Sequence, residues 1–230
     1  MSKFRKYLIY GICLMHIIGM IVVSVDQSVF NIDYFTKVQN DNQVSLKMGI
    51  SEDDVKGASQ VALDYTKGKT DDLSYYLDYN GKNIDIYSSQ DKEHMIDVYY
   101  LYQNAKLVGM FALGLLIVLI ALVCFKKISL FELAKSFNQI SIFMVIFVSV
   151  IGLFAYTNFN VFWTYFHLVF FTNDLWLMNP AVDALVNLFP EALFMALVFK
   201  VLFRFILYFI ATNILAYVYR IYSLRGLKND

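Results

Sequence analysis

Residues 105–125, AKLVGMFALGLLIVLIALVCF, decide the fold of this chain. A helix of about 20 predominantly apolar residues crosses the roughly 30 Å hydrocarbon core of a bilayer. Backbone polar groups in lipid must bond within their own segment, so such a stretch is predicted to be helical. Three further stretches have the same character: Tyr7–Val25, Gln139–Thr157 and Glu191–Tyr219. The sequence therefore predicts four transmembrane helices.

The composition supports this class. Hydrophobic residues make up 59% of the 230 residues and aromatic residues 17%, whereas soluble domains are about 45–50% apolar. The formal net charge is zero, and outside the membrane flanks there is no basic patch interleaved with aromatics, which excludes a nucleic-acid partner. Cys13 and Cys124 lie inside apolar runs, so no disulfide framework is expected. The residues before Cys13 do not form a lipobox, so the chain is not expected to be a lipoprotein itself.

Basic residues set the orientation. They flank the first span, fill the link between the second and third, and follow the fourth: Lys3, Arg5, Lys6, Lys126, Lys127, Lys135, Arg220, Arg225 and Lys228. The positive-inside rule places these flanks in the cytoplasm. The first apolar run exceeds a signal-peptide core of about 7 to 15 residues, and no A-x-A site follows, so we expect it to be retained.

The resulting domain plan has both termini inside a cell membrane and two outer loops. Its segments are the N-terminus with the first span (1–25), an extracytoplasmic domain (26–104), the second span (105–125), a cytoplasmic loop (126–138), the third span (139–157), an interfacial outer loop (158–190), the fourth span (191–219) and a cytoplasmic tail (220–230).

The first outer segment, 26–104, is expected to fold. Ser51 followed by three acids predicts a helix through about Tyr65 that closes near Gly68. Thr70-Asp71-Asp72 predicts a shorter helix through Leu77. Alternating residues in VSLKMGI (44–50) and NIDIYS (83–88) permit strands, and Asn80-Gly81 indicates a turn. We therefore expect a small mixed α/β or mostly helical extracytoplasmic domain.

Two histidines carry the chemical signal. His94 precedes the second span within EHMIDVYYLY (93–102), and His167 follows the third within FHLVFFTNDLWLMNP (166–180). The topology places both at the outer interface, where paired imidazoles favour proton transfer on a lipid ester. Asp97 falls on the helical face of His94 and is expected to accept from its ring N–H. The alternatives are a solvated His94 and a snorkelling His167. Neither outer segment holds a third His or Cys, which disfavours zinc.

Several other polar and aromatic residues are candidates for interfacial, structural or binding roles. Trp163 and Trp176 mark an aromatic belt in a loop expected to form short interfacial helices. Lys200 and Arg204, four residues apart within the fourth span, either snorkel or bind an anionic headgroup or a substrate carbonyl. His16 is expected to bond a neighbouring helix, and Asp183 and Glu191 to cap helices or orient His167.

With these residues identified, the chain resembles the lipoprotein intramolecular transacylase family, Lit. The resemblance covers four spans, the folded outer segment and four elements in order: H-x-x-D-V at 94–98, F-H-x-x-F-F at 166–171, W-x-x-x-P-x-x-D at 176–183 and FPEALF at 189–194. It implies transfer of the sn-2 acyl chain of an S-diacylglyceryl cysteine to that cysteine's own α-amino group, giving a lyso-form lipoprotein, without a cofactor.

For such a reaction we expect His94, oriented by Asp97, to act as base and His167 to donate to the leaving oxygen or steady the oxyanion, with the roles open to exchange. Direct transfer is favoured over an acyl-enzyme. The expected partners are diacylglyceryl lipoproteins and membrane lipid, with a monomer favoured and the oligomeric state open. The expected substrate-binding residues are Trp176, Tyr165, Lys200, Arg204, Asp183 and Glu191.

The competing interpretation is non-enzymatic: a membrane sensor or scaffold whose outer domain binds a ligand. A transporter is disfavoured because the sequence lacks repeats, broken helices and a charged midplane path.

Overall fold

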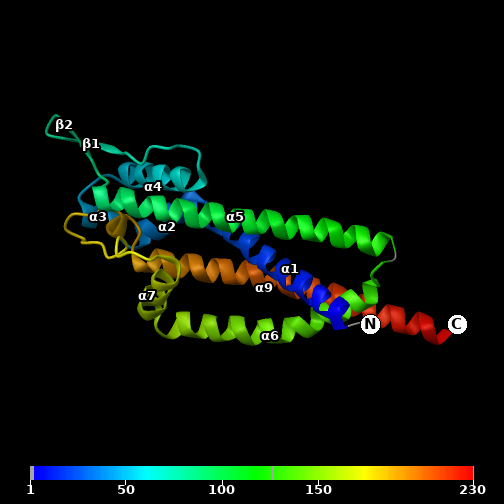
Figure 1. Ribbon diagram of the computed structural model, residues 1–230. Coiled ribbons are helices and arrows are strands. Elements are labelled where there is room, and N and C mark those ends of the chain that lie inside the picture. The colour runs from blue at the N-terminus through cyan, green and yellow to red at the C-terminus, as the bar shows by residue number, and fades with distance from the viewer. Residues whose placement is uncertain (1–2, 126, 230) are drawn as a thin grey trace. The chain divides into compact units, whose positions relative to one another are not determined.

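The computed structural model describes residues 3–125 and 127–229, which are mainly helical (Figure 1). The four longest helices are α1 (Lys3–Val29), α5 (Ser89–Cys124), α6 (Leu130–Thr157) and α9 (Glu191–Asn229). Each holds an apolar window with a mean hydropathy between 2.3 and 3.0. In the part of the chain that the structure describes, the four predicted transmembrane helices are thus confirmed.

All four helices extend beyond the spans predicted for them, because polar residues at their ends continue the helix where neither Pro nor Gly stops it. Lys126, one of the basic residues assigned to the inner side, lies outside the described residues. The side chains of Lys3 and Lys228 do so as well.

The described chain divides into two compact units. The first contains residues 3–26, 106–125, 127–154 and 200–229, and the second contains residues 27–105 and 155–199. Besides parts of the long helices, the second unit holds α2 (Ile32–Asp41), α3 (Val44–Met48), α4 (Glu52–Lys67), β1 (Tyr76–Tyr79), β2 (Lys82–Asp85), α7 (Phe159–Phe170) and α8 (Leu185–Leu188).

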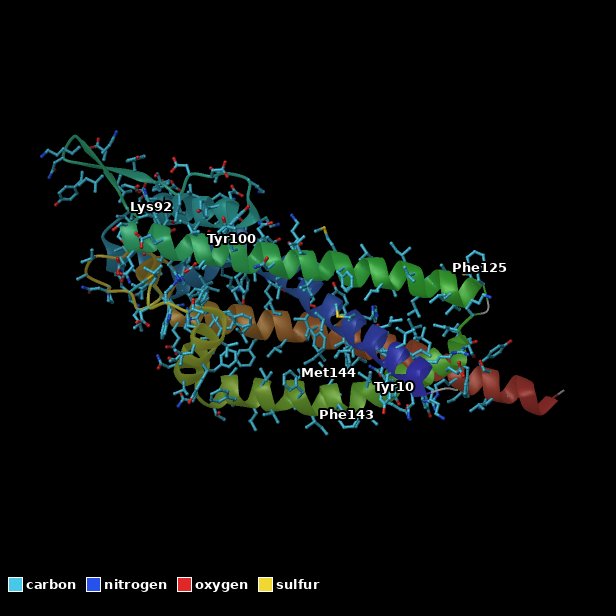
Figure 2. The ribbon with its side chains drawn as sticks, viewed as in Figure 1. Tyr10, Lys92, Tyr100, Phe125, Phe143 and Met144 are labelled. Atoms are coloured by element: carbon cyan, nitrogen blue, oxygen red, sulfur yellow. The ribbon has the colours of Figure 1, made fainter. Side chains whose placement is uncertain are left out.

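The first unit buries an apolar core and exposes many of its large apolar side chains. Ile9, Ile17, Phe137 and Phe205 belong to that core, and the ring of His16 lies 5.9 Å from that of Phe137. Large side chains such as Phe125 and Phe143 are instead about three-quarters exposed, at 75% and 74% (Figure 2). Apolar exposure on this scale suits contact with lipid.

Helices α1 and α5 approach closely at small residues. An ideal Cβ on Gly109 would lie 2.8 Å from Cγ1 of Val22, and one on Gly19 would lie 3.1 Å from Cβ of Ala112. Small residues at such points let helix backbones pack tightly in membranes.

We therefore expect Gly109→Ala to destabilise the protein by about 1–3 kcal/mol, since β-branched Val22 is stiff on a helix and its backbone must retreat. Thermal unfolding in detergent measures the effect. Gly114→Ala is the matched control, because a Cβ on Gly114 in the same helix meets nothing within 4 Å. Equal unfolding temperatures for the two variants would contradict the prediction.

In the second unit, α4 forms as the sequence predicts. The Ser51 hydroxyl accepts the Asp54 N–H at 3.0 Å, and Gly68 ends the helix at a positive φ of 74°. Its buried face, Val55, Ala58 and Ala62, joins the core with i, i+3, i+7 spacing.

Residues 44–50 were expected to permit a strand, and this was wrong, because Val44–Met48 is the helix α3. Val44 and Met48 both pack into the core while Leu46 is 75% exposed. An i, i+4 pair shares one side in a strand and in a helix alike, so the pattern did not discriminate between them.

The predicted helix from Thr70 through Leu77 was also wrong. The Thr70 hydroxyl accepts the N–H of Asp72, two residues on, at 3.1 Å, which makes a turn instead of a helix cap. The chain then enters β1, which pairs antiparallel with β2 across Asn80-Gly81, both at positive φ. The predicted turn is confirmed, and the strand expected at 83–88 is present in part as Lys82–Asp85.

Short helices α7 and α8 occupy 158–190, where short helices were expected, and α2 was not predicted. Asn158 caps α7 by accepting the N–H of Val161 at 3.2 Å. α7 and the N-terminal turns of α5, both in the second unit, carry the two histidines.

Candidate active site

His94 and His167 meet in the second unit although 72 residues separate them in sequence. Their ring centroids lie 6.1 Å apart, and each residue is only 8% exposed. The predicted proximity of the two rings is confirmed. A positive charge on one imidazole disfavours protonation of the other at this separation, so the pair favours at most one charged ring at a time.

Aromatic rings surround the pair. Phe171 contacts both histidines, with centroids 5.2 Å from His94 and 5.5 Å from His167. Trp163 meets His167 edge to face at 4.8 Å, and Trp176 stacks on it at 4.8 Å with an interplanar angle of 24°. Burial lowers the pKa of His167, against a smaller raising effect of its bond to Trp163. A neutral His167 near pH 7 follows.

A backbone carbonyl fixes the tautomer of that neutral ring. Nδ1 of His167 lies 2.7 Å from the carbonyl oxygen of Trp163. A carbonyl only accepts, so Nδ1 carries the hydrogen and Nε2 keeps a lone pair. His167 is therefore arranged to take up a proton at Nε2.

The predicted bond from Asp97 to an imidazole is not found among the described residues. Asp97 instead accepts from Nδ2 of Asn173 at 2.8 Å. Nδ1 of His94 is buried with no hydrogen-bond partner in the same part of the chain. The spacing of His94 and Asp97 allowed the predicted bond, but a side chain 76 residues away takes the carboxylate.

The residues predicted to bind substrate lie in different settings. Trp176 is at the histidine pair, whereas Tyr165 is 57% exposed on α7. Glu191 begins α9 and accepts from Asn160 at 3.1 Å. Lys200 and Arg204 lie on α9 within the first unit.

Asp183 is buried and makes its hydrogen bonds within the protein. It is 3% exposed and accepts from the Asn179 N–H at 2.6 Å and from the Ser88 hydroxyl at 2.7 Å. Both oxygens bond within the protein, but Asp183 does not cap α8, because the N-cap residue of that helix is Ala184, which makes no side-chain cap hydrogen bond.

Sequence reasoning missed Asp91, which is fully buried three residues before His94. Its carboxylate accepts three backbone N–H groups, from Ser88 at 3.0 Å, Ala184 at 2.8 Å and Leu185 at 3.2 Å. It thereby joins the start of α5 to the N-terminus of α8. No local pattern announces this, because two of the donors are more than 90 residues away.

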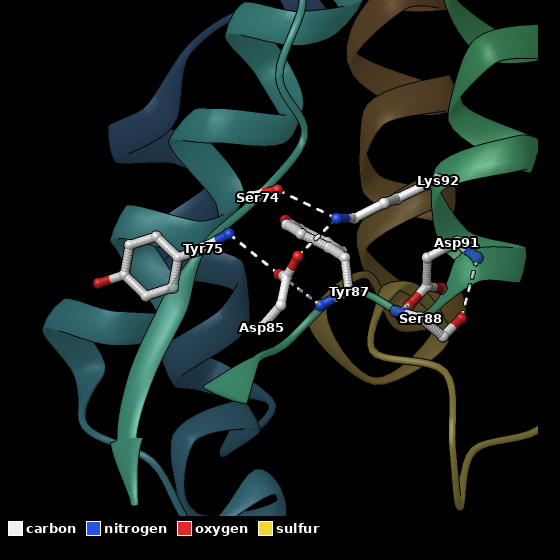
Figure 3. Close-up of polar contacts among 7 residues, drawn as sticks. All are labelled: Ser74, Tyr75, Asp85, Tyr87, Ser88, Asp91 and Lys92. Carbon is white, nitrogen blue, oxygen red and sulfur yellow. Dashed lines mark hydrogen bonds and ion pairs between the residues drawn. The ribbon is translucent and has the colours of Figure 1, made fainter. Parts of the chain in front are cut away.

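The hairpin formed by β1 and β2 is joined to the first turns of α5 by a second hydrogen-bond network (Figure 3). Lys92 donates to Asp85 at 2.5 Å and to Ser74 at 3.0 Å, and Asp85 also accepts the N–H groups of Tyr75 and Tyr87. Burial raises the pKa of Asp85, but the bonds from Lys92 and the two amides outweigh it and leave the pKa below its usual value. Two carboxylates thus fix the helix that presents His94.

The chain is similar to a known protein family and to solved structures. The family model described as "Lipoprotein intramolecular transacylase Lit" matches residues 10–194. None of the curated proteins compared matches the chain significantly.

Among solved structures, the membrane-integral lipoprotein intramolecular transacylase Lit from Bacillus cereus is similar with a TM-score of 0.75 at 16% identity, covering 100% of both chains. Two variants of that protein are also similar at 16% identity with TM-scores of 0.67. One has a histidine replaced by arginine and covers 98% of this chain and 94% of its own. The other has a histidine replaced by alanine and covers 99% and 97%.

Proposed function

The chain belongs to the lipoprotein intramolecular transacylase family, Lit, and from this premise we propose that it transfers the sn-2 acyl chain of an S-diacylglyceryl cysteine to the α-amino group of the same cysteine. Family membership makes it a multi-pass membrane enzyme that acts on lipoproteins. The acyl positions and the histidine chemistry are our proposal.

One observation supports the mechanism. His167 is buried beside His94 among aromatic rings, and its tautomer is fixed by a hydrogen bond to a backbone carbonyl. A neutral imidazole with a free Nε2 is suited to take a proton from the substrate ammonium, and buried surroundings keep competing water away. We therefore assign His167 as the base and His94 as its partner, which exchanges the roles first assigned from the sequence.

The proposed steps balance without a cofactor. Nε2 of His167 takes one proton from the ammonium, and the neutral amine attacks the ester carbonyl. The C–N bond forms as the C–O bond to glycerol breaks. The nitrogen loses its second proton to His94, and His94 delivers a proton to the glycerol oxygen. His167 then releases the first proton to water, which restores the base. Transfer is direct, and holding amine and ester together supplies most of the acceleration.

We place the second unit on the extracytoplasmic side, with both termini in the cytoplasm. α5 supports this placement by its length: 36 residues at about 1.5 Å each span roughly 54 Å, more than a bilayer core of about 30 Å. Its polar first turns then lie outside the hydrocarbon. Trp176 and Tyr165 contact the lipid part of the substrate, Lys200 and Arg204 an anionic headgroup, and the enzyme acts as a monomer.

The test is mass spectrometry of a lipoprotein's N-terminal peptide after incubation with the purified protein in liposomes. We expect the mass to be unchanged while one acyl chain becomes resistant to mild base, which cleaves esters and not amides. If both acyl chains remain labile to mild base in every sample, transacylation is refuted and a sensor or scaffold is favoured.

A further inference from the structure

Three residues on one face of α5 hold an irregular segment of the second unit. Gln90, His94 and Asp97 follow i, i+4, i+7 spacing and so share that face. Nε2 of Gln90 donates to the carbonyl oxygens of Leu175 and Leu177, both at 3.0 Å. Asp97 accepts from Asn173 at 2.8 Å. Residues 173–177 are thus bonded to α5 on both sides of His94.

Asn173 is the centre of this segment. Its Nδ2 reaches Asp97, and its Oδ1 accepts the N–H of Leu175 at 3.1 Å. Its own carbonyl accepts the indole N–H of Trp176 at 2.9 Å. The Trp176 ring is therefore fixed by a hydrogen bond at its edge while its face stacks on His167.

We propose that Gln90 and Asn173 are positioning residues that hold the Trp176 indole flat against His167, so that the ring stabilises the imidazolium formed when His167 takes the substrate proton. This rests on the proposed function. An aromatic face within about 6 Å of a cation attracts it, and the centroids here are 4.8 Å apart. The indole stack opposes the disfavouring effect of burial on the charged ring.

Two titratable groups of α5 lie at this site: His94, beside His167, and Asp97, whose carboxylate is hydrogen-bonded to Asn173 and whose charge acts on His94. A useful variant must therefore add no charge. Asn173→Leu and Gln90→Met remove the donors while keeping volume and neutrality, and Trp176→Leu removes the stacked ring while keeping an apolar side chain over His167.

The test is an NMR titration of the histidines in the whole chain in nanodiscs, together with the rate of acyl transfer measured against pH. The chain has only three histidines, so the resonances are few. We expect Asn173→Leu, Gln90→Met and Trp176→Leu each to lower the His167 midpoint by about half a pH unit and to slow transfer about 10-fold. Asn173→Leu combined with Trp176→Leu should do no more than Trp176→Leu alone, because Asn173 acts through the indole.

Asn83→Leu, at an exposed position on β2, is the control and should leave both readouts unchanged. Unshifted His167 midpoints in the three variants, or additive effects in the double variant, would overturn the positioning role. The midpoints need no turnover, so they test the inference even if the wild-type protein transfers no acyl chain, a result that would count against the proposed function alone.

Discussion

Replacement of either His94 or His167 by glutamine is expected to lower the rate of acyl transfer by about 10²–10⁴-fold, the usual contribution of a positioned acid or base. Glutamine fills similar space and retains hydrogen bonding, but it cannot exchange a proton near neutral pH. The rate is followed in liposomes as the conversion of a base-labile acyl chain into a base-stable one on the lipoprotein's N-terminal peptide.

The double variant distinguishes a working pair from two independent residues. If the rings act on one proton-transfer sequence, His94→Gln with His167→Gln should be hardly slower than the worse single variant, since groups that act as a unit are not additive. His16→Gln is the matched control: its ring packs against Phe137 in the first unit, and its loss should leave transfer intact. A sensor or scaffold would instead keep its function with glutamine at 94 and 167, which would remove the proposed mechanism.

Local patterns in the sequence were sufficient to predict the long helices. Apolar length fixed the number of spans, and the Ser51 cap with Gly68 fixed α4 within a few residues, because both signals act between neighbours in the chain. The predictions of short elements failed where a strand and a helix share one sequence pattern. Val44 and Met48 lie on one face in a strand and in α3, and only the partners that bury them decide between the two.

The candidate site shows the same limit more sharply. The outer position of His94 and His167 in sequence predicted that they would meet, since both flank spans on one side of the membrane. The partners of Asp97 and Asp91 were not predictable, because Asn173, Ala184 and Leu185 come from segments 76 to 94 residues away. The i, i+4 spacing of Gln90 and His94 was visible, but its meaning depends on carbonyls at 175 and 177.

Loss of the Asp91 carboxylate should cause a large fall in stability. Asp91→Ala would leave the N–H groups of Ser88, Ala184 and Leu185 without their acceptor in a fully buried position. Each orphaned buried donor costs about 1–3 kcal/mol, and since such terms are not fully additive we expect a destabilisation of about 3–5 kcal/mol. Thermal unfolding followed by tryptophan fluorescence measures it, because Trp163 and Trp176 both belong to the second unit.

Two further variants test whether the loss of stability is specific to the Asp91 carboxylate. Asp91→Asn keeps one oxygen but turns an N–H₂ group toward the remaining donors, so it should fall between the wild type and Asp91→Ala. Glu93→Ala removes an exposed acid two residues along the same helix and should shift the unfolding temperature little. Equal midpoints for Asp91→Ala and Glu93→Ala would contradict the network. If the network holds, transfer by Asp91→Ala should also fall at temperatures where the protein stays folded, because α8 and the start of α5, which carries His94, would no longer be joined.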